Sequence, residues 1–158
     1  LPILLLPNGK KGVREVIRHP GAVCVLPIKE DGNVIFVNQF RYAFNKVTLE
    51  APAGKLDKGE LPLDAAKREL REETGLSANN IIYLGEMYTT PALIDEIIHL
   101  YLATDLVSGE QDLDEDEFIN VIEMPLSEAE EMVMKGLIKD SKTQTLILKA
   151  SRYLNSRK

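Results

Sequence analysis

Three glutamates, Glu69, Glu72 and Glu73, follow one another at the spacing i, i+3 and i+4. At about 100° per residue, a helix places all three within one arc of roughly 100°. Hard divalent cations such as Mg²⁺ take oxygen ligands, and Mg²⁺ is commonly held by one or two carboxylates together with substrate phosphates. The other interpretation is a solvated acidic face, because runs of charge usually face the solvent. The spacing alone leaves both interpretations open.

A second group of carboxylates lies between Glu110 and Glu117, where six of eight residues are acidic and none is basic. Taken alone, such a run is also typical of a solvated surface loop. If a strand begins here, Glu115 and Glu117 would point to the same side, because side chains alternate along a strand. Beside a metal-binding helix, these glutamates would have a chemical role.

The first acidic cluster needs a helix to position it, and the sequence predicts one from Pro62 to Thr74. Proline suits the first turn of a helix, and Gly75 suits the position just after the last turn. An apolar stripe beside the glutamates would bury this helix against a sheet. Two further helices are expected, from Ser127 to about Lys135 and from Ser141 to near Leu154. Each would begin with a capping box, formed by Ser127 with Glu130 and by Ser141 with Gln144.

Apolar runs and alternating segments predict the strands. An opening apolar strand enters a turn at residues 7–9, and the turn signal Asp31-Gly32 predicts a hairpin. The other expected strands span residues 13–18, 22–28, 34–37, 81–88, 97–104 and 118–124. Strand-rich and helical segments in this order indicate an α/β protein, with layers around a mixed sheet.

The composition limits the classes of function. The chain has 158 residues, which suits one domain, and 25 acidic against 19 basic side chains give a net charge of −6. That balance argues against nucleic acid or an anionic membrane as the main partner, but not against a small anionic substrate. A single cysteine, Cys24, excludes an internal disulfide and a zinc site of several thiolates. A reducing, cytoplasmic location is the simplest expectation.

The segment around the first acidic cluster has a longer pattern. From Gly54 the chain reads Gly, five residues, Glu60, seven residues, Arg68-Glu69-Leu70, one residue, Glu72-Glu73, one residue, Gly75-Leu76. This resembles the Nudix box at every fixed position over 23 residues. The resemblance implies a Nudix-type α/β/α sandwich with a mixed sheet, and hydrolysis of a nucleoside diphosphate linked to another moiety.

The resemblance also implies roles for individual residues. The carboxylates of Glu69, Glu72 and Glu73 and the carbonyl of Ala53 would bind Mg²⁺, with Mn²⁺ as a substitute, and Glu72 would share in catalysis. Arg68 and Glu60 would pair to brace the loop. In the second acidic cluster, Glu115 would be the general base and Glu117 a further metal ligand, although the reverse assignment is also open.

Other segments resemble the ADP-ribose pyrophosphatase subfamily: residues 19–23 (HPGAV), 38–42 (NQFRY) and 50–54 (EAPAG), and Pro91 at a marker position. The resemblance implies substrate contacts by Arg14, Arg41 and Glu96, with Pro91 in the substrate loop. It also implies a homodimer, in which residues 1–18 form an N-terminal β segment at the interface and residues 19–158 form the Nudix domain. Arg14 could then act in the partner's site. One departure is Ala92, where the subfamily commonly has glycine.

We therefore expect Mg²⁺-dependent hydrolysis of ADP-ribose to AMP and ribose 5-phosphate, with a small-molecule substrate and no nucleic-acid or membrane partner. One alternative is a Nudix hydrolase for another nucleotide sugar or a nucleoside triphosphate. The other is a non-catalytic ADP-ribose sensor, which the intact box and the lack of an effector domain disfavour. Both histidines, His19 and His99, are expected to be structural, because they lack a metal-ligand pattern.

Overall fold

The computed structural model describes residues 3–109 and 120–157. Along the chain, the elements are β1 (Ile3–Leu5), β2 (Lys11–Val13), β3 (Ala22–Pro27), β4 (Asn33–Arg41), the 3-10 helix η1 (Tyr42–Phe44), β5 (Lys46–Glu50), β6 (Ala53–Lys55), α1 (Pro62–Thr74), β7 (Leu76–Tyr88), β8 (Ile97–Ser108), β9 (Asn120–Pro125), α2 (Leu126–Met134) and α3 (Ser141–Asn155). In these ranges, no helix is long and apolar enough to cross a membrane.

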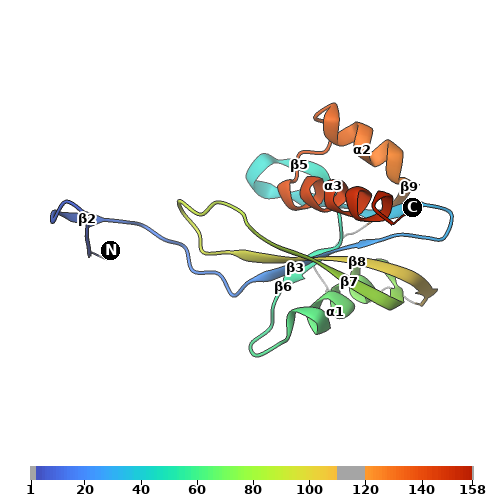
Figure 1. Ribbon diagram of the computed structural model, residues 1–158, viewed down its shortest axis with the longest axis horizontal. Coiled ribbons are helices and arrows are strands. Elements are labelled where there is room, and N and C mark those ends of the chain that lie inside the picture. Colours follow the sequence, from blue (N-terminus) through green and yellow to red (C-terminus); the bar gives the residue numbers. More distant parts are fainter. Residues whose placement is uncertain (1–2, 110–119, 158) are drawn as a thin grey trace.

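The fold is mixed α/β, as the sequence predicts. A four-stranded sheet has the order β6-β3-β8-β7, in which β3 and β8 are parallel and the other neighbours are antiparallel. An antiparallel sheet has the order β5-β4-β9, and β1 pairs with β2. Helix α1 lies on one side of the four-stranded sheet, and α2 and α3 lie on the other (Figure 1).

Strand β3 lies at the centre of the core, and all of its six residues are buried. Because side chains alternate along a strand, its two faces enter different clusters. Cys24 and Leu26 pack in the larger cluster with residues of α2 and α3. Val23 and Val25 pack in the smaller cluster with residues of α1, such as Leu70. This double burial explains the continuous apolar sequence of β3.

The turn at Asp31-Gly32 forms, but the predicted hairpin is short. Gly32 has a φ of +86°, and the carboxylate of Asp31 accepts a hydrogen bond of 3.0 Å from the backbone N–H of Asn33. A single antiparallel bridge joins Ile28 to Val34. Beyond it, β3 and β4 separate into different sheets, so the turn connects the two sheets.

Helix α1 has the predicted bounds, whereas both predicted capping boxes are wrong. Gly75 ends α1 with a φ of +72°. Helix α2 follows β9 directly through Pro125 with no side-chain cap, so Ser127 lies inside its first turn. At α3 the cap is Asp140, whose carboxylate accepts from the backbone N–H of Thr143 at 3.0 Å. Capping by Asp140 moves Ser141 into the helix.

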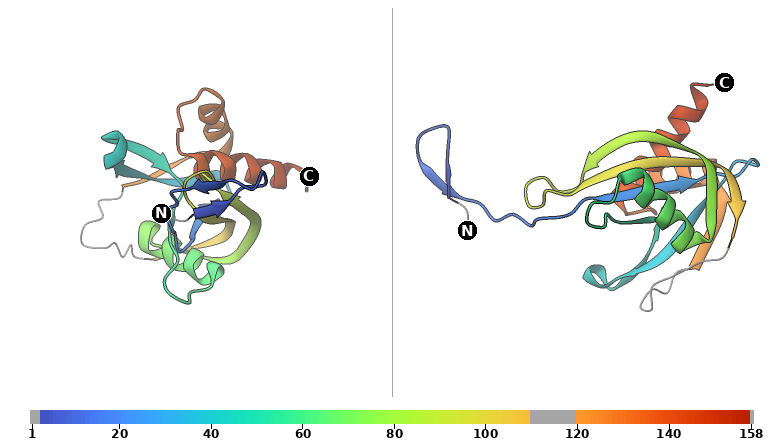
Figure 2. Two further views of the ribbon diagram at one scale, coloured as in Figure 1. Left: turned by 90° about the vertical axis from the view of Figure 1, so that its left-hand side faces the viewer. Right: turned by 90° about the horizontal axis from the view of Figure 1, so that it is seen from below.

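The N-terminal segment projects from the body of the molecule as an arm that carries the β1–β2 hairpin (Figures 1 and 2). The strand expected over residues 13–18 is interrupted. It consists of the end of β2 and a single parallel bridge between Ile17 and Ile94. The arm exposes large apolar side chains, with Ile3 67%, Leu5 77% and Ile17 52% exposed.

Candidate active site

A cavity of about 900 Å³ opens where α1, β6, β4, the β7–β8 turn and the start of α3 meet. It contains many of the site residues that the sequence predicts. Those that line it are Arg41, Ala53, Glu69, Glu72 and Glu96. Gly54, Arg68, His19, Thr89, Asp140 and Lys142 are also in its wall.

The acidic wall begins at Gly54, in β6. An added Cβ at this residue would lie 1.8 Å from Oε1 of Glu69 and 2.5 Å from Oε2. A side chain at residue 54 would therefore force the carboxylate of Glu69 to move, because that carboxylate fills the space. The contact places an anionic group directly against the backbone that follows Ala53.

Glu73 approaches the same backbone from the next turn of α1. Its Oε2 accepts a hydrogen bond of 3.1 Å from the backbone N–H of Ala53, and the residue is only 2% exposed. Hydrogen bonds from backbone N–H groups stabilise a buried carboxylate. Glu73 and Glu69 thus hold the Ala53–Gly54 segment against α1.

Arg68 joins the acidic residues of the box. It makes a bidentate pair with Glu60, through Nε at 2.8 Å and Nη2 at 2.9 Å, as the sequence predicts. Hydrogen bonds from Arg68 and from the backbone of Asp57 lower the pKa of Glu60 to about 2. Nη1 of Arg68 bridges Oε1 of Glu69 at 2.7 Å and Oε2 of Glu72 at 3.0 Å. These two carboxylates therefore already share one positive group.

The donor set fits a hard divalent cation. In the part of the chain that the structure describes, no three His, Cys, Asp or Glu side chains are already arranged as a metal cage. Carboxylate and carbonyl oxygens are nevertheless the ligands that Mg²⁺ prefers. The absent side chain at Gly54 leaves room for the carboxylate of Glu69 against the backbone that follows Ala53. Glu69 and Glu72 lie close enough to contact the same cationic nitrogen.

The opposite wall contains Arg41, held by a buried carboxylate. Nε and Nη2 of Arg41 donate to Glu50 at 2.8 and 2.6 Å, and Glu50 is 2% exposed. Burial alone would raise the pKa of Glu50, but hydrogen bonds from Arg41 and Lys142 outweigh it and hold the pKa at about 2. The guanidinium is thereby oriented at the cavity wall.

Glu96 lies at another edge of the cavity with His19 and Thr89. The hydroxyl of Thr89 donates to Glu96 at 2.8 Å. Nδ1 of His19 accepts the backbone N–H of Gly21 at 3.1 Å, so the neutral ring carries its hydrogen on Nε2. Nε2 is 3.5 Å from Oε1 of Glu96. His19 therefore faces Glu96 within the cavity, and these contacts are consistent with the structural role expected for it.

Other predicted site residues lie elsewhere. Arg14 is exposed on the arm, where its Nη1 donates to the carbonyl of Val13 at 2.9 Å. Pro91 is exposed in the β7–β8 turn, although its neighbour Thr90 lines the cavity. Glu115 and Glu117 fall outside the described residues, so their roles stay predictions.

Sequence reasoning missed the contribution of α3 to the cavity. Asp140, Ser141 and Lys142 line it, and Lys142 reaches the buried carboxylate of Glu50. The only signal was the predicted start of a helix at Ser141. A helix start does not indicate which strand it faces, so the contact could not be read from the pattern.

Similarity to known proteins identifies the family of this chain. A family model, the NUDIX domain, matches residues 18–144. The chain is 45% identical over 140 residues to an ADP-ribose pyrophosphatase of Bacillus subtilis, covering 87% of this chain and 76% of that protein. The chain belongs to the Nudix family. Hydrolases of this family generally use divalent metal ions.

Other similar proteins have names that differ from ADP-ribose pyrophosphatase. A methanol dehydrogenase activator of Bacillus methanolicus is 46% identical, again over 87% of this chain and 76% of that protein. A GDP-mannose pyrophosphatase of Cronobacter sakazakii is 39% identical over 84% and 78%. The crystal structure of an ADP compounds hydrolase matches with a TM-score of 0.86 and 22% identity, over 98% of this chain and 84% of that one. That structural match shows the shared fold.

Proposed function

We propose that this chain hydrolyses the pyrophosphate bond of ADP-ribose, giving AMP and ribose 5-phosphate, with Mg²⁺ as its natural metal and Mn²⁺ as a substitute. The observation that carries the proposal is that one cavity is lined by two kinds of side chain. Glu69 and Glu72, carboxylates of the Nudix box, lie in one part of its wall, and Arg41 and Glu96 lie in other parts of the wall. Relatives named ADP-ribose pyrophosphatase support the choice of substrate.

The carboxylates of Glu69, Glu72 and Glu73 and the carbonyl of Ala53 would hold the metal. When bound, a divalent ion neutralises the charge of the pyrophosphate and lowers the pKa of a coordinated water. Glu72, which lines the cavity, would also share in catalysis. The acidic wall otherwise repels an anionic substrate, which explains why binding would depend on the metal.

The other residues are assigned to proton transfer and to stabilisation of negative charge on the phosphates. Water attacks one phosphorus, the bond from that phosphorus to the bridging oxygen breaks, and the bridging oxygen leaves with the electron pair on the second phosphate. Glu115 takes the proton of the water as general base, with Glu117 as a further ligand. Arg41 stabilises negative charge on the phosphates. Glu96 and the loop at Pro91 contact the sugar and base portions.

We place the arm, residues 1–18, at a homodimer interface and assign residues 19–158 to the Nudix domain. Exposed apolar side chains on the arm, such as Ile3 and Leu5, support this because a second copy would bury them. The arm projects from the body of the molecule (Figure 2), and we assign Arg14 to the site of the partner. The acidic net charge and a single buried cysteine suit a cytoplasmic protein with no nucleic-acid or membrane partner.

Turnover of a substrate panel tests the proposal. ADP-ribose, ADP-glucose, GDP-mannose, NADH, diadenosine polyphosphates and nucleoside triphosphates are compared with and without Mg²⁺. Preferential, Mg²⁺-dependent conversion of ADP-ribose to AMP is the expected result. Preference for another compound would instead identify a hydrolase of a different nucleotide sugar or of a nucleoside triphosphate. Binding of ADP-ribose without turnover of any compound would identify a non-catalytic sensor.

A further inference from the structure

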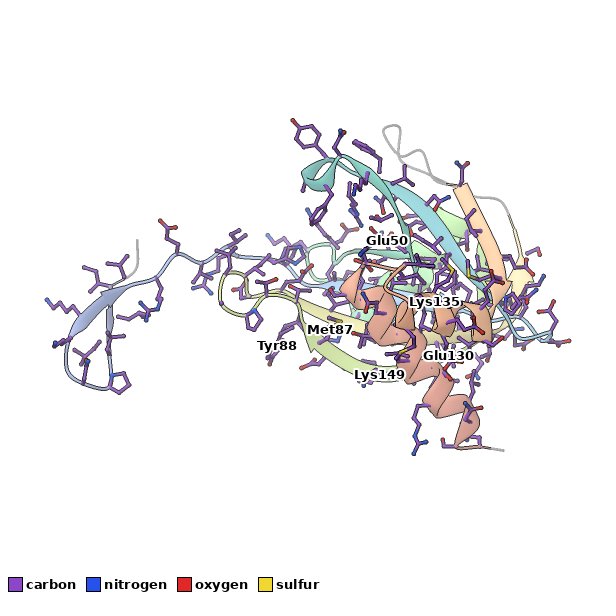
Figure 3. All side chains as sticks on the ribbon, turned by 90° about the horizontal axis from the view of Figure 1, so that it is seen from above. Glu50, Met87, Tyr88, Glu130, Lys135 and Lys149 are labelled. Atoms are coloured by element: carbon purple, nitrogen blue, oxygen red, sulfur yellow. The ribbon has the colours of Figure 1, made fainter. Side chains whose placement is uncertain are left out.

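The start of α3 meets the end of β5 in a cluster of charged residues, of which the proposed reaction uses only Arg41 directly. Its members are Arg41, Glu50, Asp140 and Lys142. Two cations balance two anions, so the cluster as a whole is neutral. Figure 3 shows Glu50 beside the end of α3 that begins at Ser141.

Glu50 is the centre of this cluster, and its carboxylate accepts four hydrogen bonds. Oε1 accepts from Nε of Arg41 at 2.8 Å and from the hydroxyl of Thr48 at 2.6 Å. Oε2 accepts from Nη2 of Arg41 at 2.6 Å and from Nζ of Lys142 at 2.7 Å. These donors fix the plane of the carboxylate, and that plane fixes the guanidinium bound to it in bidentate form.

Lys142 occupies an unfavourable place for a cation. Its side chain is only 12% exposed, and it lies in the first turn of α3, where the helix dipole disfavours positive charge. Burial would lower the pKa of Lys142, but the interactions with Cys24, Asp140 and Glu50 outweigh it and raise the pKa. Nζ contacts Oδ1 of Asp140 at 2.8 Å as well as Glu50. The charge of Lys142 therefore depends on these two carboxylates.

The same cluster fastens α3 to the chain that leads into the metal-binding wall. The hydroxyl of Thr143 accepts the backbone N–H of Ala51 at 2.9 Å and donates to Oδ2 of Asp140 at 2.6 Å. Ala51 comes shortly before Ala53 and Gly54. A change at Lys142 can therefore affect either Arg41 or the docking of α3, and the test must separate the two.

We propose that Lys142 is a positioning residue for Arg41, acting through the carboxylate that both share. Lys142 and Nη2 of Arg41 share Oε2 of Glu50, and Nε of Arg41 binds Oε1, so the carboxylate that Lys142 holds is the one that orients the guanidinium. Among the described residues Nη1 has no further partner, and the side chain of Arg41 is 41% exposed at the cavity. The guanidinium is thus available at the cavity to bind a phosphate of the proposed substrate. This inference rests on the proposed function, in which Arg41 binds the substrate.

Kinetics of Lys142→Met, in the full chain, test the inference with the compound that the wild-type protein hydrolyses fastest. Loss of the ammonium frees Glu50 to turn with Arg41, so KM rises about tenfold while kcat changes less, as expected for lost substrate binding. In the Arg41→Ala background, Lys142→Met leaves KM unchanged, because the group that it positions is gone. Lys142→Arg restores most of the affinity.

Lys149→Met is the matched control. Lys149 is exposed on the same helix, away from Glu50 (Figure 3), and its loss leaves KM at the wild-type value. An unchanged KM in Lys142→Met would overturn the inference. An equal rise in both backgrounds would overturn it too, because that result identifies a role in docking α3 alone.

A second readout does not depend on the substrate. The Nε–H signal of Arg41 in a ¹⁵N spectrum, assigned by its absence from Arg41→Ala, reports the hydrogen bond to Glu50. Lys142→Met shifts this signal and speeds its exchange with water, whereas Lys149→Met does not. An unaltered signal in Lys142→Met contradicts the inference even if no compound of the panel is hydrolysed. Failure of the proposed function and failure of this inference are therefore distinguishable.

Discussion

The carboxylate of Glu69 lies in the space that a side chain at residue 54 would need, so Gly54 and Glu69 depend on each other. An added Cβ would come within 1.8 Å of Oε1 and 2.0 Å of the carboxylate carbon. No φ between +20° and +160° is involved at Gly54, so alanine fits the backbone itself. The glycine thus allows the carboxylate of Glu69 to keep its present position.

Gly54→Ala is therefore expected to move Glu69 out of place. A displacement of about 1 Å at a catalytic group can cost about 10²-fold in rate, and we expect a loss of kcat of that order. Thermal unfolding of Gly54→Ala also shifts to lower temperature. In Gly54→Ala with Glu69→Ala, removal of the carboxylate relieves the contact, so stability returns although activity does not. A double variant as unstable as the single one would contradict this explanation.

Glu73 is expected to have two separable roles. Glu73→Ala removes the acceptor of the backbone N–H of Ala53, and leaving a buried donor unsatisfied costs about 1–3 kcal/mol in the free energy of unfolding. Glu73→Gln keeps an acceptor oxygen but loses the charge. Calorimetry should show a lower Tm for the alanine variant only, while both variants lose Mg²⁺-dependent turnover. Full activity in Glu73→Gln would exclude a metal-binding role for its charge.

The stability of the protein in acid is expected to depend on Glu50. Its pKa is lowered from 4.5 to about 2 in the folded state, so its ionised form stabilises the fold above pH 4.5. That contribution disappears as the pH falls through 2. The difference in free energy of unfolding between the wild type and Glu50→Gln should therefore shrink between about pH 5 and pH 2. Urea titrations at several pH values measure it, and a constant difference would contradict the prediction.

The arm is expected to complete the site of a second copy. Arg14→Ala and Glu72→Gln are each inactive as homodimers in this arrangement. After subunit exchange, a mixed dimer contains one site with Glu72 from one chain and Arg14 from the other. Random exchange therefore restores about a quarter of the wild-type sites.

Assays of the mixture and sedimentation of each variant measure these outcomes. No recovery in a demonstrated mixed dimer would place Arg14 in the site of its own chain. A monomeric wild type would contradict the dimer itself. Leu5→Asp, which charges an exposed apolar position of the arm, should weaken the dimer.

Glu115→Gln should lower kcat by about 10²–10⁴-fold, the range expected for loss of a general base. The affinity for Mg²⁺ should change little, because the role assigned to Glu115 is proton transfer. Glu117→Gln should instead raise the Mg²⁺ concentration that gives half-maximal rate. Turnover measured as a function of Mg²⁺ concentration distinguishes the loss of kcat from the loss of metal affinity. If Glu117→Gln lowers kcat and Glu115→Gln weakens the response to Mg²⁺, then Glu117 is the base and Glu115 the ligand.

The part of the site that could be predicted from the sequence is the part that is local in the chain. Pro62 and Gly75 define α1, and the spacing of the glutamates defines the face that they share. Residues brought together by sheet pairing were harder to predict. His19 reaches Glu96 only because the chain entering β3 runs beside the chain entering β8.

The start of α3 shows a second limit of prediction from sequence. Asp140 and Ser141 are adjacent, and either side chain can cap a helix. The carboxylate of Asp140 also contacts Lys142 and the hydroxyl of Thr143, and these contacts make it the cap. A local pattern does not contain that information, because the cluster is completed by Glu50 from another part of the chain.

The parallel pairing of β3 with β8 has a consequence for how the molecule folds. Ala22 pairs with Ile98, so everything from the turn at Asp31-Gly32 to the end of β7 belongs to one long loop that must close before the central pairing can form. Closing long loops is slow, whereas α1 and the β7–β8 hairpin need only local contacts. Refolding should therefore regain helical signal early and catalytic activity late. Residues of β3 should affect the refolding rate more than residues on the exposed face of α1.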